Sequence, residues 1–349
     1  LHLAPALAAK GHEVTALTLR DMGSKEWKRV RIVRYGLNSK NTEGINPWIL
    51  DYESKIIRAR GCLNYATKMK EKGYTPSVVI AHPGWGESLF IKQVWPDAKL
   101  KIYCEYFYNP TGYDVGFDTE FFPHDEEQKA RVHLKNAHLL LNFQSADQGM
   151  SPTRFQANTF PTHFRDKISV IHDGIDTRRL KPHFNVNFTL ENGEVLTLDN
   201  EIITFVSRAL EPYRGFHTFM RSLPTVLAER PNAVVLIVGY EGISYGQEAP
   251  DKGSWKKLIC SEIFPNLSAS QKSRVHFLGT LSRQKFTSLL QISKVHVYLT
   301  YPFVLSWSLI EAMSVGCAIV ASDTEPVREV IEHNKTGLLF NFFDYNNLA

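Results

Sequence analysis

Two arginines flank a turn that could hold a negatively charged ligand. Arg208 and Arg214 follow an apolar run, Glu201 to Ser207, which predicts a buried strand. Two guanidinium groups across such a turn can clamp a pyrophosphate, because each presents several N–H donors in a planar fork. The alternative is that both are surface arginines near a helix terminus.

A second candidate anion site lies where a helix is predicted to begin. Ser306, Trp307 and Ser308 precede an apolar run that ends at Gly316, a residue typical of a helix C-cap. The first N–H groups of a helix are free, and its N-terminal dipole end is positive, so this position suits phosphate. The following run, residues 317–322, predicts a fully buried strand.

Polar and aromatic residues follow two predicted strands in the first half of the chain. Gly84, Trp85 and Glu87 come after the strand predicted at 76–81, and Glu105 ends another predicted strand. Loops at the carboxyl edge of a parallel sheet commonly carry substrate-binding residues. A structural turn with Trp85 packed into the core explains the first group equally well.

The stretch from Tyr301 to Phe340 resembles the donor-binding motif of family 4 glycosyltransferases, which have the GT-B architecture. Its sequence F-V-L-S-W-S-L-I-E-A-M-S-V-G-C-A-I-V-A-S follows the family pattern E-G-F-G-L-x-x-L-E-A-M-A-x-G-x-P-V-V-A-S. Residues 208–215, R-A-L-E-P-Y-R-G, are similar to the family segment R-L-x-x-x-K-G. The resemblance implies an α/β fold of two Rossmann-like domains, with parallel sheets facing a central cleft.

The resemblance also implies roles for individual residues. Arg208 and Arg214 would grip the donor diphosphate, and Glu311 would bind the ribose hydroxyls. The other implied donor-binding positions are Gly279, Phe303, Ser306, Trp307, Ser308 and Glu329. The residues expected on the acceptor side are Gly84, Trp85, Glu87 and Glu105.

Three donor-site positions leave alternatives open. Phe303 falls where the family has a glutamate that contacts the donor sugar, and a phenyl ring cannot accept a hydrogen bond from a hydroxyl in the same way. Glu311 also fits an S-x-x-E capping box beginning at Ser308. Glu329 could instead stabilise a helix dipole near a helix start.

The resemblance implies a retaining hexosyltransferase that needs no metal and no cofactor besides its nucleotide-diphosphate sugar donor. The implied acceptor is a saccharide or a lipid-linked sugar, in polysaccharide or glycolipid assembly, in the cytoplasm or at the inner face of the cell membrane. One alternative is a GT-B-fold nucleotide-sugar-binding protein without transferase activity. Another is a nucleotide-sugar epimerase.

Composition narrows the class of protein. The 349 residues suffice for two α/β domains, and a net charge of +4 gives no case for nucleic acid. Four scattered cysteines indicate free thiols in a reducing compartment. No apolar run approaches the roughly 18 residues of a membrane helix.

We predict an N-terminal domain over residues 1–176, a linker with a hairpin over 177–200, and a nucleotide-sugar-binding domain over 201–349. Because the chain begins within a predicted helix and stops where another is expected, we expect a fragment truncated at both ends. The run 139–143 is predicted to be a strand, and Ser151 to cap a helix.

The helix predicted over residues 52–72 carries several basic side chains. They are Arg58, Arg60, Lys68, Lys70 and Lys72. They could meet acidic lipid headgroups as part of a peripheral membrane association, or they could form an ordinary solvated face.

Overall fold

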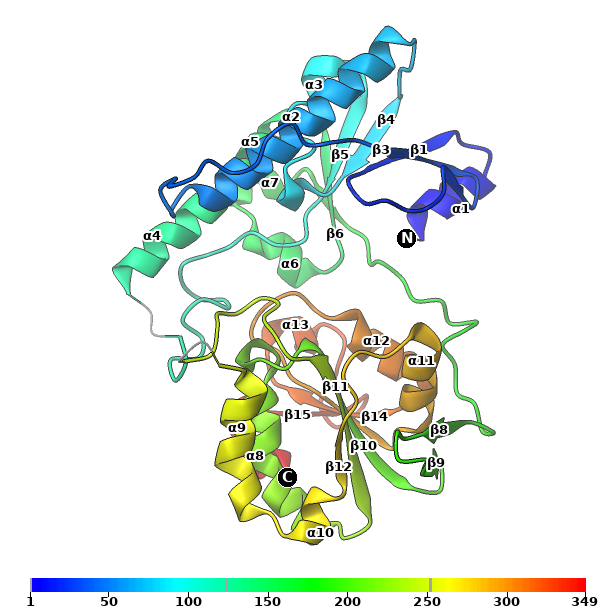
Figure 1. Ribbon diagram of the computed structural model, residues 1–349, viewed down its shortest axis with the longest axis vertical. Coiled ribbons are helices and arrows are strands. Elements are labelled where there is room, and N and C mark those ends of the chain that lie inside the picture. The colour runs from blue at the N-terminus through cyan, green and yellow to red at the C-terminus, as the bar shows by residue number, and fades with distance from the viewer. Residues whose placement is uncertain (1, 123–124, 251–252) are drawn as a thin grey trace. The chain divides into compact units, whose positions relative to one another are not determined.

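Parallel strands joined by helices build both units of the computed structural model, which describes residues 2–122, 125–250 and 253–349 (Figure 1). The first unit consists of Leu1–Pro110 with Asp125–Ile171, and the second of Thr111–His124 with His172–Ala349. The segment 111–122 therefore belongs to the second unit, although the sequence analysis assigned it to the first domain.

The first unit holds two separate sheets. In one, the order is β1-β3-β2, with β1 parallel and β2 antiparallel to β3. In the other, the four strands β4-β5-β6-β7 are all parallel. The strands are β1 (Val14–Thr18), β2 (Glu26–Trp27), β3 (Val30–Arg34), β4 (Val78–Ala81), β5 (Lys99–Tyr103), β6 (Gln148–Ser151) and β7 (Ile168–Val170). The helices are α1 (Leu3–Ala9), α2 (Leu50–Glu71), α3 (Ile91–Val94), α4 (Glu126–Lys135), α5 (Ala137–Ser145), α6 (Arg154–Thr159) and α7 (Thr162–Arg165).

The second unit is built on a six-stranded parallel sheet in the order β12-β11-β10-β13-β14-β15. The chain thus starts in the middle at β10, moves to one edge, and returns to the other side of β10. This is the order of a doubly wound nucleotide-binding sheet, with its switch point between β10 and β13. The strands are β10 (Glu201–Ala209), β11 (Ala233–Tyr240), β12 (Val275–Phe277), β13 (Val295–Tyr298), β14 (Ala318–Ser322) and β15 (Leu338–Phe340).

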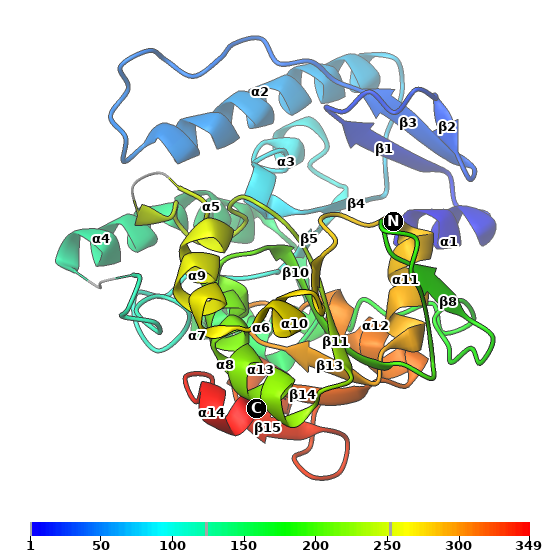
Figure 2. The same cartoon turned by 60° about the horizontal axis from the view of Figure 1, so that its bottom comes forward.

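Helices cover both faces of this sheet. In Figures 1 and 2, α8 and α9 lie on one face, and α11 and α12 on the other. The helices are α8 (Phe216–Glu229), α9 (Trp255–Ile263), α10 (Ala269–Lys272), α11 (Arg283–Ile292), α12 (Trp307–Val315), α13 (Glu325–Arg328) and α14 (Tyr345–Leu348). A hairpin of β8 (Asn187–Thr189) and β9 (Val195–Thr197) lies in the segment predicted to contain one.

Two local predictions are wrong. Residues 139–143 lie in α5 and not in a strand, and the buried positions His138, Leu139, Asn142 and Phe143 follow a helical period. A short apolar run does not separate the two structures by itself. The helix after β6 is capped by Thr153, whose hydroxyl accepts the N–H of Gln156 at 3.0 Å, and not by Ser151.

The basic residues of α2 are partly used within the first unit. Lys70 donates to the carbonyl of Val94 at 2.7 Å, and the Arg58 guanidinium lies 5.4 Å from the ring centre of Trp85. These contacts weaken the case for a continuous lipid-binding face. Among the described helices, none is both long and apolar enough to cross a bilayer.

A buried hydrogen-bond relay lies in the core of the second unit. The Ser293 hydroxyl donates to the Val295 carbonyl at 3.0 Å, so it accepts from Thr204, 2.7 Å away. The Thr204 oxygen then accepts from Nδ1–H of His296 at 2.9 Å. The other ring nitrogen of His296 is buried without a hydrogen-bond partner among the described residues. Burial lowers the pKa of His296 to about 4, because a proton on that nitrogen would place an unpaired charge in the core.

The lowered pKa of His296 predicts that the folded protein loses stability in acid. The unfolded chain binds a proton at His296 near pH 6.5, whereas the folded chain does so only near pH 4. Stability is therefore lost as the pH falls through this window, at up to about 1.4 kcal/mol per pH unit. In chemical denaturation from pH 7 to pH 4, His296→Gln should flatten the fall in unfolding free energy relative to His183→Gln, an exposed control. Equal slopes in the two variants would contradict the assignment.

Candidate functional site

The predicted clamp residues lie at the carboxyl end of β10, beside the switch point. Arg208 lies where the pairing of β10 with β11 shifts register, between Val206 and Ala209. A bulge of this kind redirects a side chain. Arg208 is exposed, and within the described ranges it forms no hydrogen bond or ion pair. Its guanidinium is therefore available to a ligand.

Arg214 ends the short 3₁₀ turn Pro212–Arg214 and is only 5% exposed. Its Nη1 donates to the hydroxyls of Thr300 at 2.7 Å and Tyr298 at 3.2 Å, and to the Val304 carbonyl at 3.0 Å. These acceptors follow or end β13, on the other side of the switch point. Arg214 therefore joins the two central strands at the sheet edge where doubly wound proteins bind ligands.

No carboxylate forms an ion pair with Arg214 in the part of the chain that the structure describes. Its hydrogen-bond partners are neutral oxygens, and two aromatic rings, Tyr245 and Phe303, have their centres 5.2 and 5.8 Å from the guanidinium carbon. The buried Glu211 carboxylate acts on Arg214 through its charge but forms no ion pair with it. A buried cation is costly when its charge is not balanced by a nearby anion. This arrangement favours an anionic ligand at Arg214.

Gly215 allows the turn to approach β13 this closely. Its φ is +66°, a conformation that residues with a Cβ rarely adopt. A Cβ at this position would lie 2.4 Å from the Cβ of Leu299. Glycine is therefore required between the turn that carries Arg214 and helix α8.

Tyr298 links Arg214 to the start of α12. Its hydroxyl, which accepts from Arg214, also accepts the N–H of Ser306 at 2.8 Å. Ser306 is the N-cap of α12, and its Oγ accepts the N–H of Ser308 at 3.3 Å. The indole N–H of Trp307 donates to Asp173 at 2.7 Å. The predicted residues Ser306 to Ser308 thus lie beside Arg214, but protein oxygens already accept two of their three backbone N–H groups.

The capping-box explanation of Glu311 is wrong. The N-cap of the helix is Ser306, two residues before Ser308, so Glu311 lies beyond the third helical position. Its Oε1 instead lies 2.6 Å from Nη2 of Arg283, at the start of α11. The Glu311 side chain is 8% exposed and that of Arg283 is 62% exposed. An exposed arginine thus neutralises a buried carboxylate at the same sheet edge.

The remaining donor-side predictions fall at loops of the second unit. Gly279 follows β12 with φ +59°, and its carbonyl accepts the N–H of Gly239 at 3.0 Å. Phe303 is buried edge-on against Tyr213 and Tyr245. Glu329 is exposed at the C-terminal end of α13, so the explanation through a helix N-terminal dipole is wrong.

Sequence reasoning missed Glu211, which orders the loop above Arg214. Its buried carboxylate accepts three successive N–H groups, from Ser244 at 3.2 Å, Tyr245 at 3.0 Å and Gly246 at 3.1 Å. Burial raises the pKa of Glu211, and the three N–H donors and the Arg214 charge oppose that shift. The signal available in the sequence was the position of Glu211, an acidic residue between the two predicted clamp arginines.

The acceptor-side predictions lie at the carboxyl ends of β4 and β5. Trp85 is 53% exposed, so the alternative in which it packs into the core is wrong. Nδ1 of His82 accepts the N–H of Gly84 at 3.1 Å, which leaves the ring proton on Nε2, 3.1 Å from the Glu105 carboxylate. His82, absent from the predicted site, thus connects Gly84 and Glu105.

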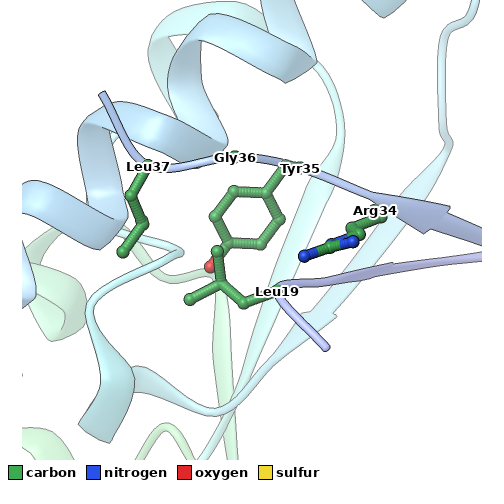
Figure 3. A pocket seen from close by; sticks show the side chains of 5 residues that line it. All are labelled: Leu19, Arg34, Tyr35, Gly36 and Leu37. Atoms are coloured by element: carbon green, nitrogen blue, oxygen red, sulfur yellow. The ribbon is translucent and has the colours of Figure 1, made fainter. Parts of the chain in front are cut away.

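Glu87 points elsewhere within the first unit. It accepts a hydrogen bond from the hydroxyl of Tyr35 at 2.8 Å, and Arg58 lies 3.8 Å from it. Tyr35 also lines a surface pocket of about 430 Å³ (Figure 3), together with Leu19, Arg34, Gly36 and Leu37. Glu87 therefore supports the pocket wall and does not join Glu105.

Within the described ranges, no group of three or more His, Cys, Asp or Glu side chains is arranged to hold a metal ion. At the end of β10, Arg208, Arg214 and the start of α12 offer positive charge to a ligand.

Two glycosyltransferase family models match this chain, one in each half of the sequence. Residues 10–180 match the family model described as Glycosyl transferase family 4 group, and residues 189–349 match Glycosyl transferases group 1. Spore coat protein SA of Bacillus subtilis is 22% identical over 97% of this chain and 78% of its own length.

Solved glycosyltransferase structures share the fold. Sucrose-phosphate synthase from Thermosynechococcus elongatus superposes with a TM-score of 0.69 at 18% identity, over 99% of this chain and 80% of its own. Anabaena HepE in complex with UDP-glucose gives a TM-score of 0.65 at 14% identity, over 99% and 83% of the two chains. The predicted GT-B fold is confirmed.

The pair formed by Glu311 and Arg283 gives a stability prediction. Arg283→Ala should leave the buried Glu311 carboxylate without its cation and lower the unfolding free energy by about 1–3 kcal/mol. Adding Glu311→Gln to that variant should restore part of the loss, because no buried charge then remains. Urea denaturation of the single and double variants measures both effects. A double variant no more stable than Arg283→Ala would contradict this account.

Proposed function

This chain belongs to the family 4 glycosyltransferases, and on that premise we propose that it moves a sugar from a nucleoside-diphosphate donor to a hydroxyl of an acceptor. The donor diphosphate would bind at the switch point of the second unit. The observation that carries this proposal is the buried Arg214 guanidinium, which forms no ion pair in the described ranges.

The proposed chemistry is charge stabilisation. As the bond between the sugar and the diphosphate breaks, negative charge grows on the leaving phosphate. Arg214, Arg208 and the start of α12 would neutralise it at fixed positions, which lowers the barrier without reorganisation. We propose that this requires no divalent ion. The acceptor hydroxyl would attack the sugar from the same face that the leaving group departs from, so that the anomeric configuration is retained. The leaving phosphate would take the proton of the acceptor hydroxyl.

Glu311 would bind the ribose of the donor. Its carboxylate is anchored by Arg283 on one oxygen, Oε1, and a carboxylate offers further lone pairs to hydroxyl donors. The UDP-glucose named in the HepE complex supports UDP as the first nucleotide to test. Gly279 would approach the base through its backbone.

We place the acceptor on the first unit. Exposed Trp85 offers an apolar ring face, and Glu105 with His82 offers polar groups beside it. An aromatic face next to a carboxylate suits a saccharide, which has both C–H and hydroxyl surfaces. We propose a saccharide or lipid-linked acceptor in polysaccharide or glycolipid assembly. A cytoplasmic location or one at the inner membrane face is a further proposal, which rests on the family alone.

A second candidate function is nucleotide-sugar binding without transfer. Phe303 favours it, because the phenyl ring is buried between Tyr213 and Tyr245 at the position of the family glutamate. Such a protein would bind the nucleotide through the same arginines. Incubation with radiolabelled UDP-sugars and a panel of saccharide acceptors separates the two functions, since only the transferase moves label to an acceptor.

Titration calorimetry with UDP, GDP and ADP tests the proposed donor site. We expect one nucleotide to bind, and Arg208→Ala to weaken it at least tenfold, because an exposed guanidinium contact to a phosphate is lost. Arg230→Ala is the matched control. Arg230 pairs with Glu201 at the opposite end of β10, and its side chain is 64% exposed.

Two results would contradict the donor site. One is a folded wild-type protein that binds none of the three nucleotides. The other is equal loss of affinity in Arg208→Ala and Arg230→Ala, which would indicate attraction by net charge and no specific clamp.

A further inference from the structure

Residues 111–122 form a strap, which packs on the second unit although the chain before and after it belongs to the first. The strap contains no helix or strand. It is held instead by three acidic side chains, Asp114, Asp118 and Glu120, which all bind residues of the second unit. No role for this segment follows from the family motifs.

Asp118 is the most deeply buried of the three, at 1% exposed. Its Oδ2 accepts from the Tyr301 hydroxyl at 2.6 Å and lies 3.3 Å from Nε2 of His217. Its Oδ1 accepts the N–H of Glu120 at 3.1 Å. Burial lowers the pKa of His217 to about 3, so this histidine is neutral and donates through Nε2–H. Burial raises the pKa of Asp118, and the directed hydrogen bonds and the Arg221 charge oppose that shift.

The other two acidic residues anchor the strap on either side of Asp118. Asp114 accepts a hydrogen bond from the hydroxyl of Tyr213. Glu120 forms a bidentate pair with Arg221 of α8, at 2.6 and 2.8 Å, and Arg221 also binds Glu262 at 2.7 Å. Three separate anchors fix the path of a segment that lacks secondary structure of its own.

Both tyrosines that bind the strap are next to the donor site. Tyr213 directly precedes Arg214, and Tyr301 directly follows Thr300, which accepts from Arg214 at 2.7 Å. The N–H of Tyr301 donates to the Tyr213 carbonyl at 3.2 Å, and the two rings lie 4.7 Å apart. The strap therefore holds the two backbone segments that meet around the guanidinium.

We propose that the strap is a positioning element of the donor site, in which Asp114 and Asp118 fix Tyr213 and Tyr301 and thereby hold Arg214 against its hydroxyl and carbonyl acceptors. The identity of the ligand rests on the proposed function, but the positioning does not. Tyr213, Tyr301, Asp114 and Asp118 are positioning residues, because they act on Arg214 and not on the donor.

Hydrogen exchange tests the positioning without any ligand. In the double variant Tyr213→Phe/Tyr301→Phe the rings remain, so their packing is kept while both hydrogen bonds to the strap are lost. We expect amide exchange to rise at least tenfold at Tyr301 and Ser306, whose N–H groups close the loop around Arg214. Tyr345→Phe, at an exposed tyrosine of α14, is the matched control. Unchanged exchange at these amides would overturn the proposal.

Measuring UDP affinity then distinguishes a strap that positions Arg214 from one that only stabilises the fold. At a temperature where thermal scans show all variants folded, the double variant should bind UDP about tenfold more weakly than wild type and Tyr345→Phe. Faster exchange with unchanged UDP affinity would overturn the positioning role. If the wild type binds no nucleotide, the proposed function fails, and the exchange data alone decide whether the strap holds Arg214.

Discussion

The proposed donor site of this protein depends on the burial of one cation. Arg214 lies at the switch point of a parallel sheet and forms no ion pair with the described residues. Neutral oxygens and aromatic faces surround it, and the buried Glu211 carboxylate offsets part of its charge. An anionic ligand would stabilise a buried cation that has no ion pair of its own. That constraint fits the three oxygens of residues 298–304 that accept hydrogen bonds from Arg214. It also favours a diphosphate as the ligand of the site.

The surrounding elements keep that cation in place. Gly215 lets the turn approach β13, Tyr298 connects the guanidinium to the start of α12, and Glu211 holds the loop with Tyr245 over it. Each contact joins the end of one strand to the end of another. The site therefore depends on the sheet order, because β10 and β13 are parallel neighbours whose carboxyl ends lie together.

The sequence predicted the architecture, because parallel-sheet strands are short buried runs. It also predicted both arginines at the end of a strand, where the structure has them, and their role as a clamp stays a prediction. It did not predict which oxygens bind Arg214, since Tyr298 is far from it in the chain. The partner of Glu311 was missed for the same reason, and a local capping pattern suggested the wrong one. The strap was missed because a segment without periodicity carries no signal of where it docks.

The position of the diphosphate in a UDP complex tests this account most directly. A crystal structure of the protein with UDP should show phosphate oxygens within hydrogen-bond distance of both Arg208 and Arg214, with the Arg214 contacts to Thr300 and Val304 retained. UDP bound with its diphosphate out of reach of Arg214 would contradict the claim that the donor diphosphate binds this buried cation.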